Sequence, residues 1–383
     1  MMKTILRTTT LTLLALVLVS KMGRAQSTQP DDDFDRYILE QMEQVGIPGA
    51  TVVVSHQGRL LKSRGYGSAN IEWEVPASPE TVYEIASVTK LFTALATMML
   101  VEEGALDLDA PIARYIEGVP ESHRSITARH LLTHTAGLVP DHYDSFKLLA
   151  PTMLRYSSGV QLADLFAKPL ASKPGAAHQY GGSNMFLLGV LIAEISGMPY
   201  EEFMRQRIFE PAGMVNTSFV DANAVVPQRA QGYTLRRGEL VRWSIEQNLQ
   251  ALEGNAFAGM LSTATDLQRF SEALRTDRLI AAETQHAMLE PHRLPDGSYG
   301  EGSISRIALG WWIQEDMAGH RCASHVGHTG SAFHYFPDAG FAVIFLSNLT
   351  KGYDFMGDQG VEASVRHSIA ERAVETFLNG AQR

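Results

Sequence analysis

Cysteine is almost absent from this sequence, because the 383 residues contain only one, Cys322. An internal disulfide needs two thiols, so the fold must be held by its apolar core, for which a chain of this length is sufficient. A thiol nucleophile would have His325 or His328 as its nearest histidine partner. Nothing else in the sequence supports that interpretation.

Positive charge is also in short supply. The chain has 32 Lys and Arg residues against 42 Asp and Glu, which gives a net charge of −10 at pH 7. Its Lys and Arg residues form no basic cluster. A chain this acidic is a poor candidate for binding nucleic acid or an anionic membrane surface, so we expect neither partner.

The apolar run near the N-terminus is too short to span a bilayer comfortably, since it covers residues 11–19. Lys3 and Arg7 precede it, and Gly23-Arg24-Ala25 offers small residues at the positions that a signal peptidase reads. We therefore predict that residues 1–25 are a cleaved signal peptide and that residues 26–383 are secreted or periplasmic. Cleavage would remove four positive and no negative charges, so the net charge would go from −10 to −14. An uncleaved N-terminal anchor is the alternative; without a nearby cysteine we expect no lipoprotein anchor.

Several familiar site patterns are missing. No serine lies in a G-x-S-x-G elbow, which argues against an α/β-hydrolase. His130 and His134 stand four apart, the spacing of a zinc pair on a helix, but no glutamate base lies between them. His325, His328 and His334 are close in sequence, yet no carboxylate or cysteine pattern completes a ligand set. We expect no metal and no cofactor, and interpret His130 and His134 as structural.

The clearest chemical signal is Ser87-Val88-Thr89-Lys90, the S-x-x-K pattern. Residues three apart on a helix share a face, so a helical turn would place the Lys90 ammonium beside the Ser87 hydroxyl. Residues 91–101 are apolar almost all round, which predicts a helix buried in a large core. Ser87 would then stand at its N-terminus, where developing negative charge is favoured. Taken alone, a capping serine and a surface lysine explain the motif as well.

The remaining pattern predicts a sheet built from both ends of the chain. Strands and helices at the two ends, about residues 26–106 and 290–383, enclose a mostly helical stretch of about residues 107–289. The predicted elements are a helix over 34–45 ending at Gly46, a hairpin over 51–62, a helix over 185–195 ending at Gly197, a strand over 308–313, a hairpin over 334–346 and a helix over 361–377. Within the predicted strand over 308–313, Trp311 and Trp312 could line a cleft, although core packing suits at least one of them.

A serine nucleophile needs a base, an oxyanion site and a surface that holds the substrate. Two further stretches could supply them. Tyr180 lies in a loop, residues 174–180, just before the predicted helix over 185–195. Residues 325–331 lead into the C-terminal hairpin and contain small residues that let a substrate approach the backbone closely.

Together, five ordered motifs resemble a known family. They are residues 87–90, 126–138, 208–214, 259–263 and 328–330. The family comprises the serine hydrolases that include class C β-lactamases, D-Ala-D-Ala carboxypeptidases of the penicillin-binding proteins, D-aminopeptidases and related esterases. The resemblance covers nearly all of residues 26–383. It implies an α+β sandwich of the β-lactamase/transpeptidase-like fold, an antiparallel sheet flanked by helices with an inserted, mostly helical subdomain.

The resemblance also implies a two-step acyl transfer. Ser87 would attack a carbonyl while Lys90 and a Tyr180 phenolate take its proton, and Tyr180 would protonate the leaving group. Water would then release the acyl group. Backbone N–H groups of Ser87 and Ser331 would form the oxyanion hole. Because a tyrosine is normally protonated near pH 7, this role needs a nearby cation, for which Lys90 is the candidate.

Two departures from the family pattern bear on the substrate. Gly182 stands where many relatives have an amide side chain that orients an acylamino group, and Asn184 could replace it only in a rearranged loop. His328 stands where typical β-lactamases have lysine. The resemblance implies that residues 328–331 form a substrate-facing strand, with His328, Thr329 and Gly330 binding the substrate. A histidine is mostly neutral at pH 7, so we expect weaker recognition of a substrate carboxylate.

The sequence therefore predicts an exported serine hydrolase that acts through an acyl-enzyme. Its expected partner is a small-molecule ester, amide or peptide, with small esters or D-amino-acid-containing amides as the leading substrates. A β-lactamase is the alternative enzyme. A non-catalytic binding protein for cell-wall peptides with the same fold is the alternative from another class. The sequence leaves the oligomeric state open.

Overall fold

A computed structural model describes residues 31–139, 158–221, 223–243, 256–299, 305–350 and 360–380, with only the backbone described at 158–161 and 360–364. The predicted signal peptide, residues 1–25, lies outside the described residues, as does the predicted start of the mature chain at residue 26.

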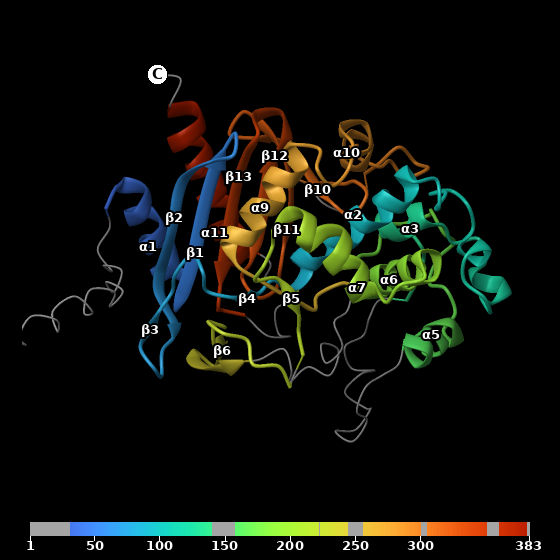
Figure 1. Ribbon diagram of the computed structural model, residues 1–383, viewed down its shortest axis with the longest axis horizontal. Coiled ribbons are helices and arrows are strands. Elements are labelled where there is room, and N and C mark those ends of the chain that lie inside the picture. The colour runs from blue at the N-terminus through green and yellow to red at the C-terminus, as the bar shows by residue number, and fades with distance from the viewer. Residues whose placement is uncertain are drawn as a thin grey trace, which may run out of the picture.

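The centre of the molecule is an eight-stranded antiparallel sheet in the order β3-β2-β1-β13-β12-β11-β10-β9 (Figure 1). The N-terminal and C-terminal strands meet in its middle, where β1 pairs with β13 from Ala50 opposite Ser347 to His56 opposite Phe341. The strands are β1 (Gly49–His56), β2 (Arg59–Asn70), β3 (Val75–Pro76), β9 (Arg306–Ile307), β10 (Trp312–Met317), β11 (His320–Val326), β12 (Ala332–Phe336) and β13 (Phe341–Ser347).

Both faces of the sheet are apolar because helices cover both. Successive side chains of a strand point to opposite faces, so Val52 and Val54 pack with α1 (Asp33–Val45) and α11 (Gly360–Ala373). Val53 points the other way, into the core that contains α2 (Thr89–Glu102) and α9 (Ala264–Arg275). Strands buried on both faces read as continuous apolar runs, which explains the all-buried sequence of β13.

Helix α2 is the core element of the helical part. Nearly every side chain from Thr89 to Leu100 is buried, as predicted from its apolar sequence. The other helices of the described middle of the chain are α3 (Ala128–Leu132), α5 (Ser158–Ala167), α6 (Gly182–Ser196), α7 (Tyr200–Met204), α8 (Glu210–Ala212) and α10 (Ala282–Leu289). In the described part of the chain, no single helix has the length and apolar character needed to cross a membrane. Only α6 taken with Tyr200–Ala212 meets that test, as a pair bent by 79°.

Most predicted elements are confirmed. They are α1 with Gly46 as its left-handed cap, the β1–β2 hairpin, α6 with Gly197 as its cap, the β12–β13 hairpin, and α11 continued by a π-helical turn over Val374–Asn379.

The predicted strand over 308–313 is wrong. β9 ends at Ile307 and β10 begins at Trp312, with a turn at Gly310 between them. Gly310 has φ +80°, and a Cβ there would lie 2.4 Å from Cβ of Ala94 in α2. The apolar residues of this stretch are therefore buried by contact with a helix far away in sequence, instead of by continuing the strand.

The middle of the chain also contains strands that its helical pattern did not predict. They are β5 (Ser218–Phe219) and β8 (Met260–Ser262), which form a three-stranded sheet with β4 (Tyr83–Glu84), the short strand before Ser87, and the hairpin of β6 (Gly232–Arg236) and β7 (Glu239–Trp243). Strand β11, which mixes polar and apolar residues, was likewise not predicted.

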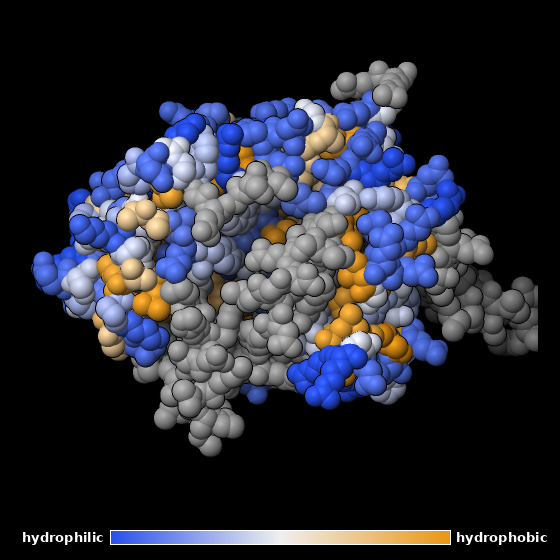
Figure 2. Space-filling model, turned by 180° about the vertical axis from the view of Figure 1, so that it is seen from behind, coloured by the Kyte–Doolittle hydropathy of each residue, from blue (hydrophilic) through white to orange (hydrophobic). Residues whose placement is uncertain are grey.

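One face of the molecule is mainly polar where its residues are described. Hydrophilic residues cover most of the coloured part of the face drawn in Figure 2, and apolar residues appear there in small separate groups. Exposed large apolar side chains include Ile71, Trp73 and Val75 near the β2–β3 turn and Leu235 and Leu240 in the β6–β7 hairpin.

Candidate active site

The predicted nucleophile lies where a strand turns into the central helix. β4 ends at Glu84, and a 3₁₀ turn over Ala86–Val88 leads into α2. Ala86 adopts φ +44°, a left-handed conformation that costs free energy in a residue with a Cβ. Lys90 Nζ donates a hydrogen bond to Ser87 Oγ at 2.9 Å. The predicted contact between these two side chains is therefore present.

Lys90 is buried, with only 2% of its surface exposed, while Ser87 is half-buried. Its ammonium donates a second hydrogen bond to the backbone carbonyl of Phe257, also at 2.9 Å. The same nitrogen lies 5.0 Å from the centre of the Tyr180 ring, within the range of a cation–π contact. These groups take the place of water around the buried charge.

Tyr180 lies in the loop that leads into α6, directly before Gly181, which caps that helix. Its side chain is 41% exposed. Ring centres of His134, Trp312 and His325 lie 4.7, 6.3 and 6.3 Å from its own. The structure thus brings Tyr180 to the Lys90 ammonium, which is itself bonded to Ser87 Oγ.

The predicted strand over 328–331 is wrong, because these residues form a turn between β11 and β12. This turn is attached directly to the segment that carries Ser87. Thr329 Oγ1 donates to the carbonyl of Glu84 at 2.5 Å. Ser331 Oγ donates to the carbonyl of Ile85 at 2.9 Å. Both acceptors stand just before Ser87, so two buried hydroxyl groups fix the distance between residues 328–331 and the predicted nucleophile.

Gly330 and Arg366 fix the turn over residues 328–331. Gly330 has φ +76°, and a Cβ on it would lie 2.0 Å from Ser347 Oγ, so only glycine fits. Arg366 reaches from α11 and donates to the carbonyl of Gly327 at 2.6 Å and to that of Ser331 at 3.3 Å. The turn is therefore held by the hydrogen bonds of Arg366 and by the close approach of Gly330 to Ser347.

Two backbone N–H groups are available at the centre of this arrangement. Within the described residues, neither the N–H of Ser87 nor that of Ser331 donates a hydrogen bond. Backbone N–H groups normally find acceptors, so a pair without them is able to bind a ligand oxygen.

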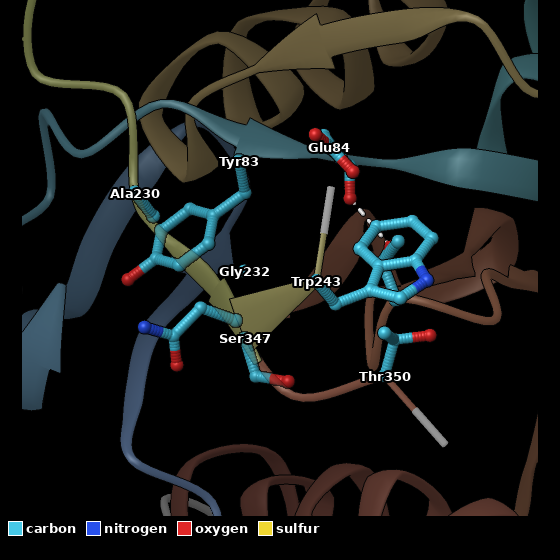
Figure 3. A pocket seen from close by; sticks show the side chains of 9 residues that line it. Tyr83, Glu84, Ala230, Gly232, Trp243, Ser347 and Thr350 are labelled. Atoms are coloured by element: carbon cyan, nitrogen blue, oxygen red, sulfur yellow. Dashed lines mark hydrogen bonds between the residues drawn. The ribbon is translucent and has the colours of Figure 1, made fainter. Parts of the chain in front are cut away.

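His328 is exposed on its outer side, and its ring meets that of Trp243 edge to face with centres 5.6 Å apart. Packed protein atoms around the ring, together with the Lys90 and Arg366 cations, lower the pKa of His328 to about 4. It is therefore neutral at pH 7, as the sequence predicted. Figure 3 shows the pocket behind this segment, lined by Tyr83, Glu84, Ala230, Gly232, Trp243, Thr329, Ser347, Asn348 and Thr350.

Asn184 does not supply the amide side chain that Gly182 lacks. Gly182 is the buried first residue of α6, and Asn184 follows within the same turn, with 3% of its surface exposed. Asn184 Nδ2 bonds back to the carbonyl of Gly181 at 3.4 Å. Asn184 thus belongs to the helix interior instead of the site surface, and the loop is not rearranged to present it.

The possible zinc spacing has another explanation. α3 ends at Leu132, so His130 and His134 do not share a helix face. His130 accepts the N–H of Thr127 at 3.2 Å as part of a capping box, whereas His134 lies beside Tyr180. Among the described residues no group of three or more His, Cys, Asp or Glu side chains could hold a metal ion.

Of the two tryptophans and the cysteine that the sequence offered as site residues, only Trp312 lies beside Tyr180. Trp311 is completely buried in the core, while Trp312 contacts Tyr180. Trp312 therefore fits the cleft-lining alternative and Trp311 fits core packing. Cys322 is buried in β11, and burial raises the pKa of its thiol far above the usual value, which makes it a poor nucleophile. The site residues whose positions sequence patterns did not predict include His134, Phe257 and Arg366. His134 does belong to the motif over 126–138.

Comparison with known proteins adds the evolutionary context. A protein-family model described as Beta-lactamase matches residues 34–364. Protein flp of Staphylococcus aureus strain N315 is 26% identical over 326 residues, which are 83% of this chain and 63% of that protein. The putative penicillin-binding protein PbpX of Bacillus subtilis strain 168 is 27% identical over 281 residues, 73% of this chain and 66% of that protein. The matches thus span just under two thirds of the length of these relatives.

Solved structures share the fold. The octameric penicillin-binding protein homologue from Pyrococcus abyssi superposes with a TM-score of 0.73 at 27% identity, covering 90% of this chain and 77% of that chain. The D-amino acid amidase from Ochrobactrum anthropi SV3 gives a TM-score of 0.73 at 23% identity, covering 91% of this chain and 100% of that chain. EstCE1, a hydrolase with promiscuous acyltransferase activity, gives 0.73 at 22%, covering 88% and 98%. The architecture is the β-lactamase/transpeptidase-like fold.

Proposed function

The chain belongs to the Beta-lactamase family, and from that premise we propose that it is a serine hydrolase whose catalytic centre is formed by Ser87, Lys90 and Tyr180. The observation that carries this proposal is the Lys90 ammonium, which lies 2.9 Å from Ser87 Oγ and 5.0 Å from the centre of the Tyr180 ring. A serine and a base within hydrogen-bond reach, with a third group beside the base, is the arrangement that activates a nucleophile.

In the first step, Ser87 Oγ attacks the substrate carbonyl and the Lys90–Tyr180 pair takes up its proton. The N–H groups of Ser87 and Ser331 stabilise the negative oxygen of the tetrahedral intermediate. Tyr180 then passes the proton to the leaving oxygen or nitrogen, whose bond to the acyl carbon breaks. In the second step, water attacks the acyl-enzyme, the ester bond to Ser87 breaks, and the acid leaves with the serine hydroxyl restored.

The proposed substrates are of two kinds, small esters and D-amino-acid-containing amides. A neutral His328 offers a hydrogen bond but no fixed positive charge, so a substrate carboxylate gains little there. Gly182 offers no side chain to orient an acylamino group. The fold shared with a D-amino acid amidase and with the hydrolase EstCE1 supports the same choice.

A β-lactamase is the second candidate. The family match and the relative described as a putative penicillin-binding protein favour it. His328 and Gly182 disfavour it, because both remove contacts that would hold the carboxylate and acylamino groups of a β-lactam.

Turnover by purified residues 26–383 tests these proposals. The substrates are a p-nitrophenyl short-chain ester, a D-alanyl anilide and a chromogenic cephalosporin, each compared with a Ser87→Ala variant. Ser122→Ala, which changes a serine in another 3₁₀ turn, is the matched control. We expect Ser87-dependent turnover of the ester or anilide. Dominant cephalosporin hydrolysis would establish the second candidate, and no turnover of any of the three would favour a non-catalytic binding protein.

We also propose that residues 1–25 direct export and are removed. The support is their sequence alone, a basic start followed by an apolar run and small residues. Cell fractionation with N-terminal sequencing of the product tests this. A start at residue 26 in an extracytoplasmic fraction is expected, and an intact N-terminus would contradict cleavage.

A further inference from the structure

His134 is a buried residue in an uncommon backbone conformation. It follows α3 with φ +53°, and only 1% of its surface is exposed. Residues other than glycine hold this conformation only when their surroundings impose it. Here the N–H of Thr135 bonds to the carbonyl of His130 at 2.7 Å, and the hydroxyls of Thr133 and Thr135 bond to each other at 2.9 Å. The loop is therefore rigid at the position of His134.

His134 contacts three consecutive residues of the loop that carries the proposed base. Its backbone carbonyl accepts the N–H of Gln179 at 2.7 Å. Its ring packs on that of Tyr180 with centres 4.7 Å apart. Its Nδ1 accepts the N–H of Gly181 in a long contact of 3.5 Å. The strained backbone of His134 is what allows its carbonyl and its ring to face the same short segment.

We propose that His134 is a positioning residue for Tyr180, which clamps the loop on both sides of the phenol and keeps that phenol at the Lys90 ammonium. The inference rests on the proposed function, because it assigns a role relative to Tyr180 as base. It gives a task to the histidine of the 126–138 motif, which the mechanism above does not use.

The clamp needs a neutral ring. Nδ1 accepts an N–H only with its lone pair free, so the proton must be on Nε2. The ionisable side chain of Tyr180 packs on the His134 ring. The other ionisable groups that face His134 are Lys90 from α2, His178 from the Tyr180 loop and His325 from β11. Burial first, and then these groups, lower the pKa of His134 well below its usual value. The form that the clamp requires is thus the form present at neutral pH.

Two substitutions separate the ring from the backbone. His134→Gly keeps a residue suited to positive φ and keeps the carbonyl contact, but it removes the ring and the acceptor. His134→Asn also tolerates this conformation and places an acceptor oxygen near the position of Nδ1. His123→Asn changes another buried histidine, which packs on Phe166, and serves as the matched control.

We expect His134→Gly to lower kcat for the p-nitrophenyl ester by about tenfold to a hundredfold with little change in KM, because a misplaced base slows the chemical step more than binding. His134→Asn should recover part of that loss. The pH at which kcat/KM is half-maximal should shift in His134→Gly, since Tyr180 has moved relative to Lys90. His123→Asn should leave kcat and the pH midpoint unchanged.

A double-mutant cycle with Tyr180→Phe decides whether His134 acts through the tyrosine. In the Tyr180→Phe background, His134→Gly should cost no further activity. An equal loss in both backgrounds with an unchanged pH midpoint would show a merely structural role and overturn the inference. If Tyr180→Phe has no measurable rate, the pH midpoint of the single His134→Gly variant decides alone.

The same experiment separates this inference from the proposed function. Ser87→Ala with wild-type turnover would refute the catalytic centre itself. If Ser87→Ala and Tyr180→Phe lose activity as expected while His134→Gly keeps the wild-type kcat, the centre stands and the positioning role is refuted.

Discussion

Lys90 is a cation around which the histidine rings of the site are neutral. Burial, followed by the Lys90 charge, lowers the pKa of His325 to about 3 and that of His328 to about 4. The same two causes lower the pKa of His134 well below its usual value. Because these histidine rings are neutral at neutral pH, they do not compete with the Lys90 ammonium for Ser87 Oγ or the Tyr180 phenol.

Replacing the lysine tests this arrangement. We expect Lys90→Met, which keeps the length of the buried stem and removes the ammonium, to lower the rate of Ser87 acylation by about 10² to 10⁴. Stopped-flow release of p-nitrophenol measures it. Lys168→Met removes an exposed lysine paired with Asp164 and should keep the wild-type rate. A Lys90→Met variant with an unchanged acylation rate would contradict the proton role.

Replacing Gly330 by alanine should destabilise the protein for two reasons, a strained backbone and a steric clash, which a control variant can separate. Gly330→Ala places a Cβ at positive φ and also 2.0 Å from Ser347 Oγ. Gly319→Ala has the same conformational problem at φ +90° with no atom within 4 Å. Thermal unfolding should show a loss for Gly330→Ala that exceeds that of Gly319→Ala, on the order of 1 to 3 kcal/mol in all, with a large loss of turnover. Equal losses would mean that the Ser347 contact is relieved at no cost.

At the scale of elements, local pattern predicted what local contacts determine. The apolar stripe of α1 and the turn residues of the β12–β13 hairpin identify these elements without knowledge of the rest of the chain. The break before β10 was not predictable, because Gly310 turns against Ala94 of α2, a residue more than 200 positions earlier. The β6–β7 hairpin has mixed exposure along both strands, so its alternation is weak.

The same division holds at the site. The contact between Ser87 and Lys90 follows from helix geometry over one turn, so the sequence alone predicts it. The approach of Tyr180 and of Thr329 depends on partners far away in sequence, and only the family resemblance suggested it. The spacing of His134 from His130 suggested one helix and a zinc pair, and the lack of a glutamate between them led to a structural interpretation, whereas α3 ends before His134.

The packing of α11 on the sheet should depend on pH. His334 of β12 is fully buried, and its ring centre lies 5.2 Å from that of His367 in α11. Burial, His367 and Arg366 lower the pKa of His334 well below 6.5, so the folded protein keeps it neutral. The unfolded chain binds a proton below about pH 6.5 and the folded protein does not, so the free energy of unfolding falls as the pH drops through that range.

Urea unfolding at about pH 7.5 and about pH 5.5 measures this dependence. We expect His334→Leu to lose about 1 kcal/mol less than the wild type over that range, since one proton-linked group is gone. His286→Leu, which replaces an exposed histidine on α10, should behave as the wild type. An equal pH dependence in all three proteins would exclude His334 as its source.

At the scale of the whole molecule, the net charge of −10 acts on every charged substrate that approaches. Such a field repels anions over about a Debye length, and salt screens it. We expect kcat/KM for a p-nitrophenyl ester with a carboxylate on its acyl chain to rise when the ionic strength goes from about 0.02 M to about 0.2 M. The corresponding uncharged ester is the control and should not respond. A fall for the anionic ester would indicate a positively charged entrance.

The pairing of β1 with β13 also constrains how the chain can fold. Ala50 and Ser347 lie side by side in the finished sheet although almost 300 residues separate them along the chain. While the protein is being synthesised, β1 can form its hairpin with β2, but its other edge has no partner until the last strand has emerged. Long-range pairings of this kind slow folding, and an open apolar edge invites aggregation in the meantime. Chains that stop short of β13 should therefore precipitate instead of accumulating as a folded N-terminal half.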